Sequence, residues 1–146
     1  MRVSDILKDK GDRVITVRET MPLSAAVRIL HDERIGALVI DDNAGGLLGV
    51  VSEREVVSAL AQLGAVALHR PLREIMINRA LSVAPADPVL HAMRVMTEQR
   101  ARHLPVVEAG KVVGLLSLGD VVKSRLAEKQ QENLVLQDMA RWPHAA

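Results

Sequence analysis

The sequence predicts a mixed α/β (α+β) fold in which one β-α-β-β-α unit occurs twice. Residues 102–122 contain two runs rich in leucine and β-branched residues, Leu104–Val107 and Val112–Leu116, separated by a short turn. A helical pattern that opens on Ser117 and Asp120 follows directly, which completes the order strand, turn, strand, helix. A looser copy of the same order lies about 65 residues upstream, at residues 35–57.

The spacing of matched residues supports a duplication. The pairs separated by 66 residues are Pro22/Pro88, Ala26/Ala92 and Arg28/Arg94, and Val39/Val106 are separated by 67. The pairs separated by 65 residues are Gly49/Gly114, Ser52/Ser117, Val56/Val121 and Val57/Val122. We therefore expect one extra residue before the second copy's hairpin and a longer hairpin turn in the first copy. Neither copy has enough strands to cover its own sheet, so the two copies should pack face to face with pseudo-twofold symmetry.

Apolar periodicity and turn residues give the expected elements of each copy. Those of the first copy are the helix Val3–Lys8 capped by Ser4, the strand Val14–Val17, a helix with Leu23, Ala26, Val27 and Leu30 on one face, the strands Gly36–Ile40 and Leu47–Val51, and a helix from Glu53 that ends at Gly64. Those of the second copy are the short helix Leu72–Met76, the strand Ala80–Val83, a helix with Val89, Ala92, Met93 and Met96 on one face, and the hairpin and helix of residues 102–122.

These elements divide the chain into four parts. We expect repeat 1 at residues 1–65, a linker at 66–71, repeat 2 at 72–128, and a C-terminal helical extension and tail at 129–146. The last helix should continue to about Met139, although residues 128–133 are polar all round. Its later apolar residues, Leu134, Val135, Leu136 and Met139, need a partner surface, which is either the N-terminal helix of the same chain or another subunit.

The composition excludes several classes of function. With one Trp, no Phe and no Tyr, the chain lacks the aromatic rings on which single-stranded nucleic acids stack. A net charge of +1 gives no electrostatic footprint for DNA or for an anionic membrane surface. There is no cysteine, no signal-peptide pattern at the N-terminus and no apolar run as long as a membrane helix. We expect a cytoplasmic protein that binds neither nucleic acid nor membrane.

The segment Gly114–Asp120 is the most specific chemical signal in the sequence. Ser117 stands where a helix begins, so its hydroxyl and the free amides of the first turn are suited to hold a phosphate. Asp120 is an acceptor placed to bridge the two vicinal hydroxyls of a ribose. The same Ser-x-x-Asp pattern is also a capping box that needs no ligand, and Ser52 with Glu55 repeats it in the first copy. We favour a ligand at Ser117 and Asp120 and a plain cap at Ser52.

Arg102 and His103 are the reason for favouring a ligand at Ser117. A cation and an imidazole at the start of a buried strand are positioned to face the same helix N-terminus and bind an anion. In the first copy we align these positions with Ile35 and Gly36, which are apolar and small and suit the flat face of a base. The alternative is a solvated pair in a loop.

Catalysis and metal binding have little support. The five histidines, His31, His69, His91, His103 and His144, show no metal-ligand spacing. The sequence contains no nucleophile elbow, no dinucleotide-binding glycine motif and no phosphate-binding loop of the Walker type. We expect a protein that is not an enzyme and has no catalytic cofactor and no metal.

The two copies resemble a pair of CBS domains, also called a Bateman module. The resemblance covers about residues 3–126, and RHLPVVEAGKVVGLLSLGDVV in the second copy is highly specific. RIGALVIDDNAGGLLGVVSEREVV in the first copy is of the same kind. The resemblance implies a regulatory module that binds an adenosine-containing ligand in clefts between the repeats: AMP foremost, with ADP, ATP, NAD or S-adenosylmethionine as alternatives.

The resemblance also implies roles for individual residues. Asp120 would hold the ribose, Ser117 would lie beside the phosphate, and Arg102 and His103 would contact the phosphate. The base would lie against the opposite repeat, at Lys10, Ile15, Thr16, Ile35, Gly36 and Ala37. A second, symmetry-related cleft would use Ser52, Arg54, Glu55, Leu81 and Ser82. It departs from the family pattern because Glu55 replaces the aspartate, and Arg54 is available for the phosphate of a larger ligand such as NAD.

Similarity to stand-alone modules of this kind further implies a homodimer that signals to a protein target which the sequence does not name. The alternative function is a ligand-independent scaffold for dimerisation or protein interaction, in which both Ser-x-x-Asp/Glu motifs serve only as helix caps.

Overall fold

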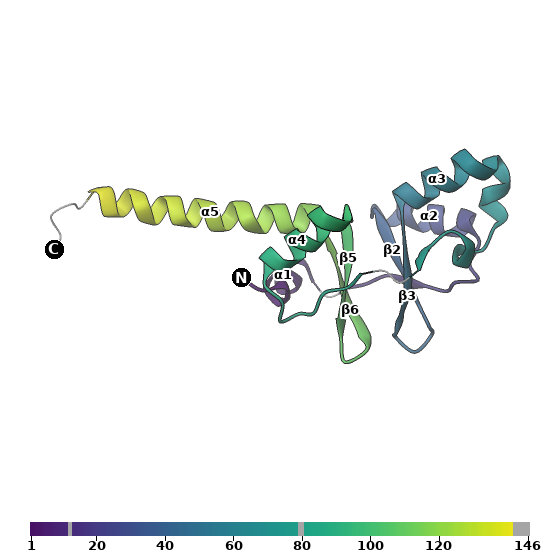
Figure 1. Cartoon of the computed structure of the whole chain (residues 1–146), viewed down its shortest axis with the longest axis horizontal. Helices are drawn as coiled ribbons and strands as arrows, with labels where there is room; N and C mark the ends of the chain where they lie inside the picture. The colour runs from purple at the N-terminus through teal and green to yellow at the C-terminus, as the bar shows by residue number, and fades with distance from the viewer. Residues whose placement is uncertain (12, 79–80, 142–146) are drawn as a thin grey trace.

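The computed structural model describes residues 1–11, 13–78 and 81–141, and it has the predicted α+β architecture. Two halves lie next to each other, each with a β-hairpin and helices beside it (Figure 1). The hairpin turns of both halves point to the same side of the molecule, away from the helices α3 and α5. The long helix α5 extends beyond the body of the protein.

The first half contains a four-stranded sheet with the strand order β1-β2-β3-β4. Its elements are β1 (Thr16–Val17), α2 (Leu23–Glu33), β2 (Ala37–Asp41), β3 (Leu47–Ser52), α3 (Glu53–Leu63) and β4 (Ile77–Asn78). Strand β1 is parallel to β2, whereas the β2–β3 and β3–β4 pairs are antiparallel. The fourth strand therefore comes from the segment that follows the first repeat in sequence.

The second half repeats this pattern with fewer paired residues. Its elements are α4 (Val89–Gln99), β5 (His103–Glu108), β6 (Lys111–Ser117) and α5 (Leu118–Arg141). Strands β5 and β6 form an antiparallel hairpin, and Val83 makes a single parallel bridge to Val106. This bridge takes the place that β1 has in the first half. The predicted strand Ala80–Val83 is thus reduced to one bridge at Val83, and Ala80 lies outside the described residues.

The opening segments of the two repeats are exchanged. Helix α1 (Val3–Lys10) places Val3 and Ile6 in the core of the second half, beside Val83, Val89 and Leu104. Conversely, Leu72, at the start of the 3₁₀ turn η2 (Leu72–Glu74), is buried in the core of the first half. Another 3₁₀ segment, η1 (Gly64–His69), leads to it and buries Ala67 in the same core. Each core is therefore completed by the other repeat's first residues.

The structural register differs from the sequence alignment at the second hairpin. Ile40 pairs with Gly49 in the first hairpin and Val106 with Gly114 in the second, so Ile40 and Val106 are equivalent at a separation of 66. Val17 pairs with Ile40 and Val83 bridges to Val106, which gives Val17/Val83 the same separation. The extra residue expected before the second hairpin is absent, and the match of Val39 to Val106 is wrong. Both strands have an unbroken apolar centre, so their side chains alone do not fix the register.

The cause of this constant separation lies in the preceding helix ends. Helices α2 and α4 both end on an arginine with left-handed backbone, Arg34 (φ 55°) and Arg100 (φ 52°). Two residues then lead to the strand in each half, which begins at Ala37 or at His103. The counterparts of Arg102 and His103 are therefore Gly36 and Ala37, and not Ile35 and Gly36.

Two short helices also differ from prediction. Helix α1 begins after Arg2, whose backbone N–H donates to the carboxylate of Asp5, so Ser4 lies within the helix and does not cap it. The helix predicted at Leu72–Met76 is only the three-residue turn η2. Helix α3 agrees with the prediction, since it begins at Glu53 and ends before Gly64.

Close backbone approach joins the halves on the side of the hairpin turns. The N–H of Val112 donates to the carbonyl of Gly45 over 2.9 Å. A Cβ atom on Gly49 would lie 2.7 Å from the carbonyl oxygen of Ile77, so this glycine is what allows β4 to pair with β3. The two halves therefore meet along a seam, with β3 near β5.

Helix α5 is held by the body only over its first three turns. Val121 and Ser124 are buried, whereas every residue from Lys129 to Arg141 is exposed. The four apolar residues that need a partner are exposed by 60% (Leu134), 50% (Val135), 61% (Leu136) and 67% (Met139), so the N-terminal helix does not cover them. No helix within the described residues is long and apolar enough to cross a membrane.

Candidate nucleotide site at the seam

Ser117 and Asp120 form a complete capping box at the start of α5. The Ser117 N–H donates to Oδ2 of Asp120 over 2.9 Å, and the Asp120 N–H donates to Oγ of Ser117 over 3.1 Å. The strand leads directly into the helix, and the Leu118 N–H is satisfied by the carbonyl of Arg102. These bonds fix the carboxylate of Asp120 at the first turn of α5, close to the free amides of that turn.

Lys10, at the end of α1, binds Asp120 within the second half. Its ammonium group donates to Oδ2 of Asp120 over 2.7 Å and to the carbonyl oxygen of Leu115 over 2.7 Å. The side chains of Lys10 and Asp120 are 37% and 23% exposed, so the ion pair is partly removed from water. Lys10 therefore lies at the carboxylate expected to hold the ribose, on the side where α1 meets α5.

These contacts control the ionisation of Asp120. Burial by itself raises the pKa of this carboxyl group, but the hydrogen bonds from Lys10 and Ser117 and the charge of Lys10 outweigh it. The pKa of Asp120 consequently lies below its ordinary value, and the group is an anion at neutral pH.

His103 lies between the two halves. It pairs with Ser117 in the β5–β6 hairpin, and a Cβ atom on Gly36 would lie only 3.1 Å from its Nε2 atom. Burial and the charge of Lys10 lower the pKa of His103, whereas Glu53, Glu55 and Asp120 act in the opposite direction. The imidazole is thus close to charged groups from both halves, and it is neutral at physiological pH because its pKa lies below 6.5.

A cavity of about 970 Å³, called here the seam cavity, opens where the halves meet. It is lined by Gly36, Val50, Ser52, Glu53, Arg54, Glu55, Val57, Ser58, Ile77, Leu81, Gln99, Arg100, Ala101, Arg102, His103 and Leu104. The start of α3 contributes one wall and the connection from α4 to β5 contributes the other. This volume is in the range of small-molecule sites.

The seam cavity brings together most of the predicted second cleft. Ser52, Arg54, Glu55 and Leu81 line it, whereas Ser82 does not. Glu55 is already engaged by its own cap, since the Ser52 hydroxyl donates to both of its carboxylate oxygens at 2.9 Å. Arg102 and His103, which we assigned to the Ser117 cleft, also face this cavity.

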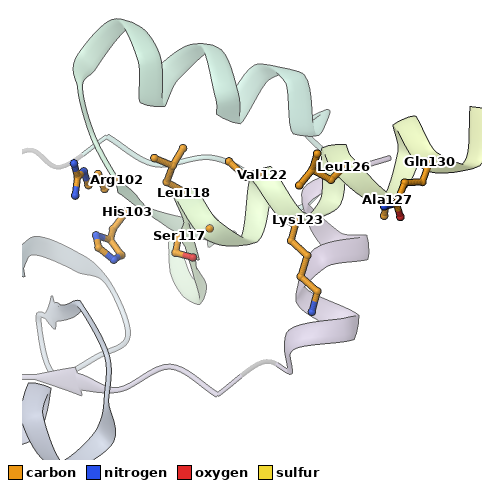
Figure 2. A pocket seen from close by; sticks show the side chains of 10 residues that line it. Arg102, His103, Ser117, Leu118, Val122, Lys123, Leu126, Ala127 and Gln130 are labelled. Atoms are coloured by element: carbon orange, nitrogen blue, oxygen red, sulfur yellow. The ribbon is translucent and has the colours of Figure 1, made fainter. Parts of the chain in front are cut away.

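A second hollow of about 750 Å³, the α5 groove, continues from the same strand along α5. Figure 2 shows Arg102, His103 and Ser117 at its end near the start of α5, with Lys123, Leu126 and Gln130 further along the helix. Three apolar side chains, Leu118, Val122 and Leu126, form a stripe along it and are 41%, 45% and 59% exposed. Most residues that line this hollow lie on one face of α5, so it resembles a surface for helix packing more than a nucleotide cleft.

The remaining predicted site residues line neither hollow. They are Lys10, Ile15, Thr16, Ile35, Ala37 and Asp120. Ile15 and Ile35 pack against the core of the first half, and Ala37 is buried at the start of β2. Thr16 is exposed on β1. Of this group, the structure joins only Lys10 directly to the Ser117 and Asp120 motif.

The sequence prediction missed Gln99 and Arg100, which line the seam cavity beside Arg102. The repeat could have indicated this segment, because Arg34 and Arg100 are separated by 66 residues and end equivalent helices. The sequence prediction also placed Lys10 at the base, whereas the ammonium pairs with Asp120, the carboxylate that we predicted to hold the ribose. Among the described residues, no group of three or more acidic, histidine or cysteine side chains is arranged to hold a metal ion.

The comparisons with known proteins agree with this architecture. The CBS domain model matches residues 3–62 and 72–127, which is most of the chain in two repeats. The chain therefore belongs to the CBS domain family, and it carries a pair of these domains.

Solved structures of CBS-domain proteins superpose closely on it. A CBS-domain containing protein from Agrobacterium tumefaciens is 37% identical, with a TM-score of 0.82 over 86% of this chain and 99% of that one. A CBS domain protein from Pyrobaculum aerophilum in complex with AMP is 32% identical, with a TM-score of 0.72 over 82% of this chain and 89% of that one.

A CBS domain pair in complex with 5′-methylthioadenosine and S-adenosyl-L-methionine is 28% identical, with a TM-score of 0.77 over 89% of this chain and 98% of that one. Among curated proteins, a mitochondrial CBS domain-containing protein of Arabidopsis thaliana is 30% identical over 140 residues, which cover 89% of this chain and 67% of that protein.

Proposed function

We propose that this chain is a regulatory module that binds an adenosine-containing ligand at the seam between its CBS domains and transmits the bound state through dimer or partner contacts. The observation that carries the proposal is the convergence of Asp120, Ser117 and Lys10 at the start of α5, next to His103, whose ring lies against Gly36 of the first half. Relatives with the same fold are solved with AMP, methylthioadenosine or S-adenosylmethionine. AMP is the ligand we favour, and ATP and NAD are alternatives.

The chemistry of the site suits a nucleotide. The first-turn amides of α5 attract an anion, and a carboxylate held in its charged form accepts hydrogen bonds from vicinal hydroxyls. The seam cavity has Arg54, Arg100 and Arg102 on its walls, so a second ligand with more than one phosphate fits there. We propose that the module acts without a catalytic step, in the cytoplasm, as a homodimer that contacts a protein target.

Calorimetry with AMP, ATP, NAD and S-adenosylmethionine tests the proposal. The Asp120→Ala variant should bind the preferred ligand at least tenfold more weakly, because hydrogen bonds to a charged acceptor are lost. Asp138→Ala is the matched control, since Asp138 lies on the exposed end of the same helix. Equal affinity of the Asp120→Ala variant and the parent would overturn the assignment of the ribose carboxylate.

A ligand-independent scaffold is the second candidate function. It is favoured by one observation, namely that both Ser-x-x-Asp/Glu motifs close as full capping boxes without a ligand. A ligand at 100 times its dissociation constant stabilises the folded state by about 2.7 kcal/mol, which raises the melting temperature. A scaffold would show no such rise with any of the four compounds.

A further inference from the structure

We propose that Lys10 makes the Asp120 site selective for adenosine ligands that carry an anionic 5′ group. Resting on the function proposed above, this inference names the chemical class of ligand. The ammonium of Lys10 occupies Oδ2 of Asp120, which is one of the two oxygens that a ribose diol would use. A ligand that binds Asp120 must therefore weaken or displace this ion pair.

A second contact holds Lys10 in place when a ligand binds to Asp120. The same ammonium donates to the carbonyl of Leu115, two residues before Ser117 on β6, over 2.7 Å. Its helix is firmly attached, because Val3 and Ile6 are buried and the N–H groups of Val3 and Ser4 donate to the carbonyls of Asp87 and Pro85. Lys10 thus behaves as a fixed cation at the edge of the ribose position.

The charge balance around this cation then favours an anionic ligand. A ribose that hydrogen-bonds to Oδ2 of Asp120 leaves the carboxylate charged but displaces its direct contact with the Lys10 ammonium, and a neutral nucleoside offers this cation no charged partner in exchange. The acidic groups Glu53 and Glu55 that influence His103 lie on α3 of the first half, and neither forms an ion pair with Lys10 within the described residues. A 5′-phosphate at the first turn of α5 restores the balance, because it places negative charge next to Lys10 and the helix amides.

Paired titrations with AMP and adenosine test this role, since the two compounds differ only in the phosphate. The parent should prefer AMP, and Lys10→Met should reduce the ratio of the two dissociation constants roughly fivefold, through weaker AMP binding and tighter adenosine binding. Lys10→Arg should retain most of the preference because it keeps the charge.

Lys8→Met is the matched control, because Lys8 is exposed on the same helix and has no ion pair within the described part of the chain. It should leave the ratio unchanged. If the parent binds AMP but Lys10→Met keeps the parent ratio, the selectivity role is wrong and the proposed function stands. If the parent binds neither compound, this inference fails, and the proposed function fails with it only if ATP, NAD and S-adenosylmethionine also do not bind.

Discussion

At the scale of single residues, His103 links the two halves electrostatically. Its ring lies against Gly36, and the charged groups that influence it are Lys10 and Asp120 on one side and Glu53 and Glu55 on the other. In the unfolded chain these surroundings disappear, and its pKa returns to about 6.5. His103 therefore gives the protein a stability that depends on pH near neutrality.

The direction of this dependence follows from the lowered pKa. As the pH falls through 6.5, the unfolded chain takes up the proton before the folded chain does, so folding becomes less favourable. We expect the melting temperature of the parent to fall more steeply than that of His103→Gln between about pH 7.5 and about pH 5.5. Asp120 does not interfere, because its lowered pKa removes stability only below 3.8. Parallel melting curves for the two proteins would contradict the prediction.

Side-chain contacts were predictable from the sequence where the two residues are close together in the chain. Ser117 and Asp120 are three residues apart, and their capping box follows from that spacing. The ion pair of Lys10 and Asp120 joins residues 110 positions apart, and no local pattern indicates it. The pair forms because α1 packs in the second half, and hydrophobic periodicity does not reveal that placement.

At the scale of elements, glycines decide how closely the strands and helices approach. A Cβ atom at Gly49 would meet the Ile77 carbonyl at 2.7 Å and the Met76 sulfur at 2.9 Å. We expect Gly49→Ala to lower the free energy of unfolding by about 1–3 kcal/mol, because β4 must move away from β3. Urea denaturation followed by circular dichroism measures this change.

Gly119→Ala is the comparison, since its Cβ would only touch Oγ of Ser117 at an ordinary 3.7 Å. It should leave stability unchanged or raise it by up to about 1 kcal/mol, because alanine favours the helix. Similar losses at both positions would show that close approach is not what Gly49 provides.

The elements themselves were largely predictable, whereas their register was not. The apolar faces of α2 and α4 and the hairpin turns gave the order of elements in both repeats. Strands β2 and β5 are buried along most of their length, so a shift of one residue leaves an equally apolar pattern. The arginines that end α2 and α4 in left-handed backbone fix the register, and that conformation is not encoded by an obvious glycine.

At the scale of the whole molecule, α5 needs a partner. The exposed residues Lys129–Arg141 form an unsupported helical end of a length that is marginal in water by itself. Leu118, Val122 and Leu126 add an apolar stripe nearer the body. Two groups of exposed apolar side chains on one helix, separated by the polar residues 128–133, are typical of an interface, which agrees with the proposed homodimer.

Sedimentation measurements test the dimer. We expect the parent to sediment as a dimer and the double variant Val122→Asp with Leu126→Asp to sediment as a monomer, since two charges would be buried in the contact. Val66→Asp, an exposed apolar position in the first half, should remain dimeric. A parent that is monomeric at all accessible concentrations would remove the dimer from the proposal.

The exchange of α1 and Leu72 between the two cores has a consequence for the integrity of the protein. A cut in the exposed chain near Ala65 would separate two fragments that each lack a piece of their own interior and carry the missing piece of the other. Such fragments are expected to be poorly structured alone and to reassociate when mixed. The two repeats would then associate without the peptide bond between them, because each repeat contributes a segment to the core of the other.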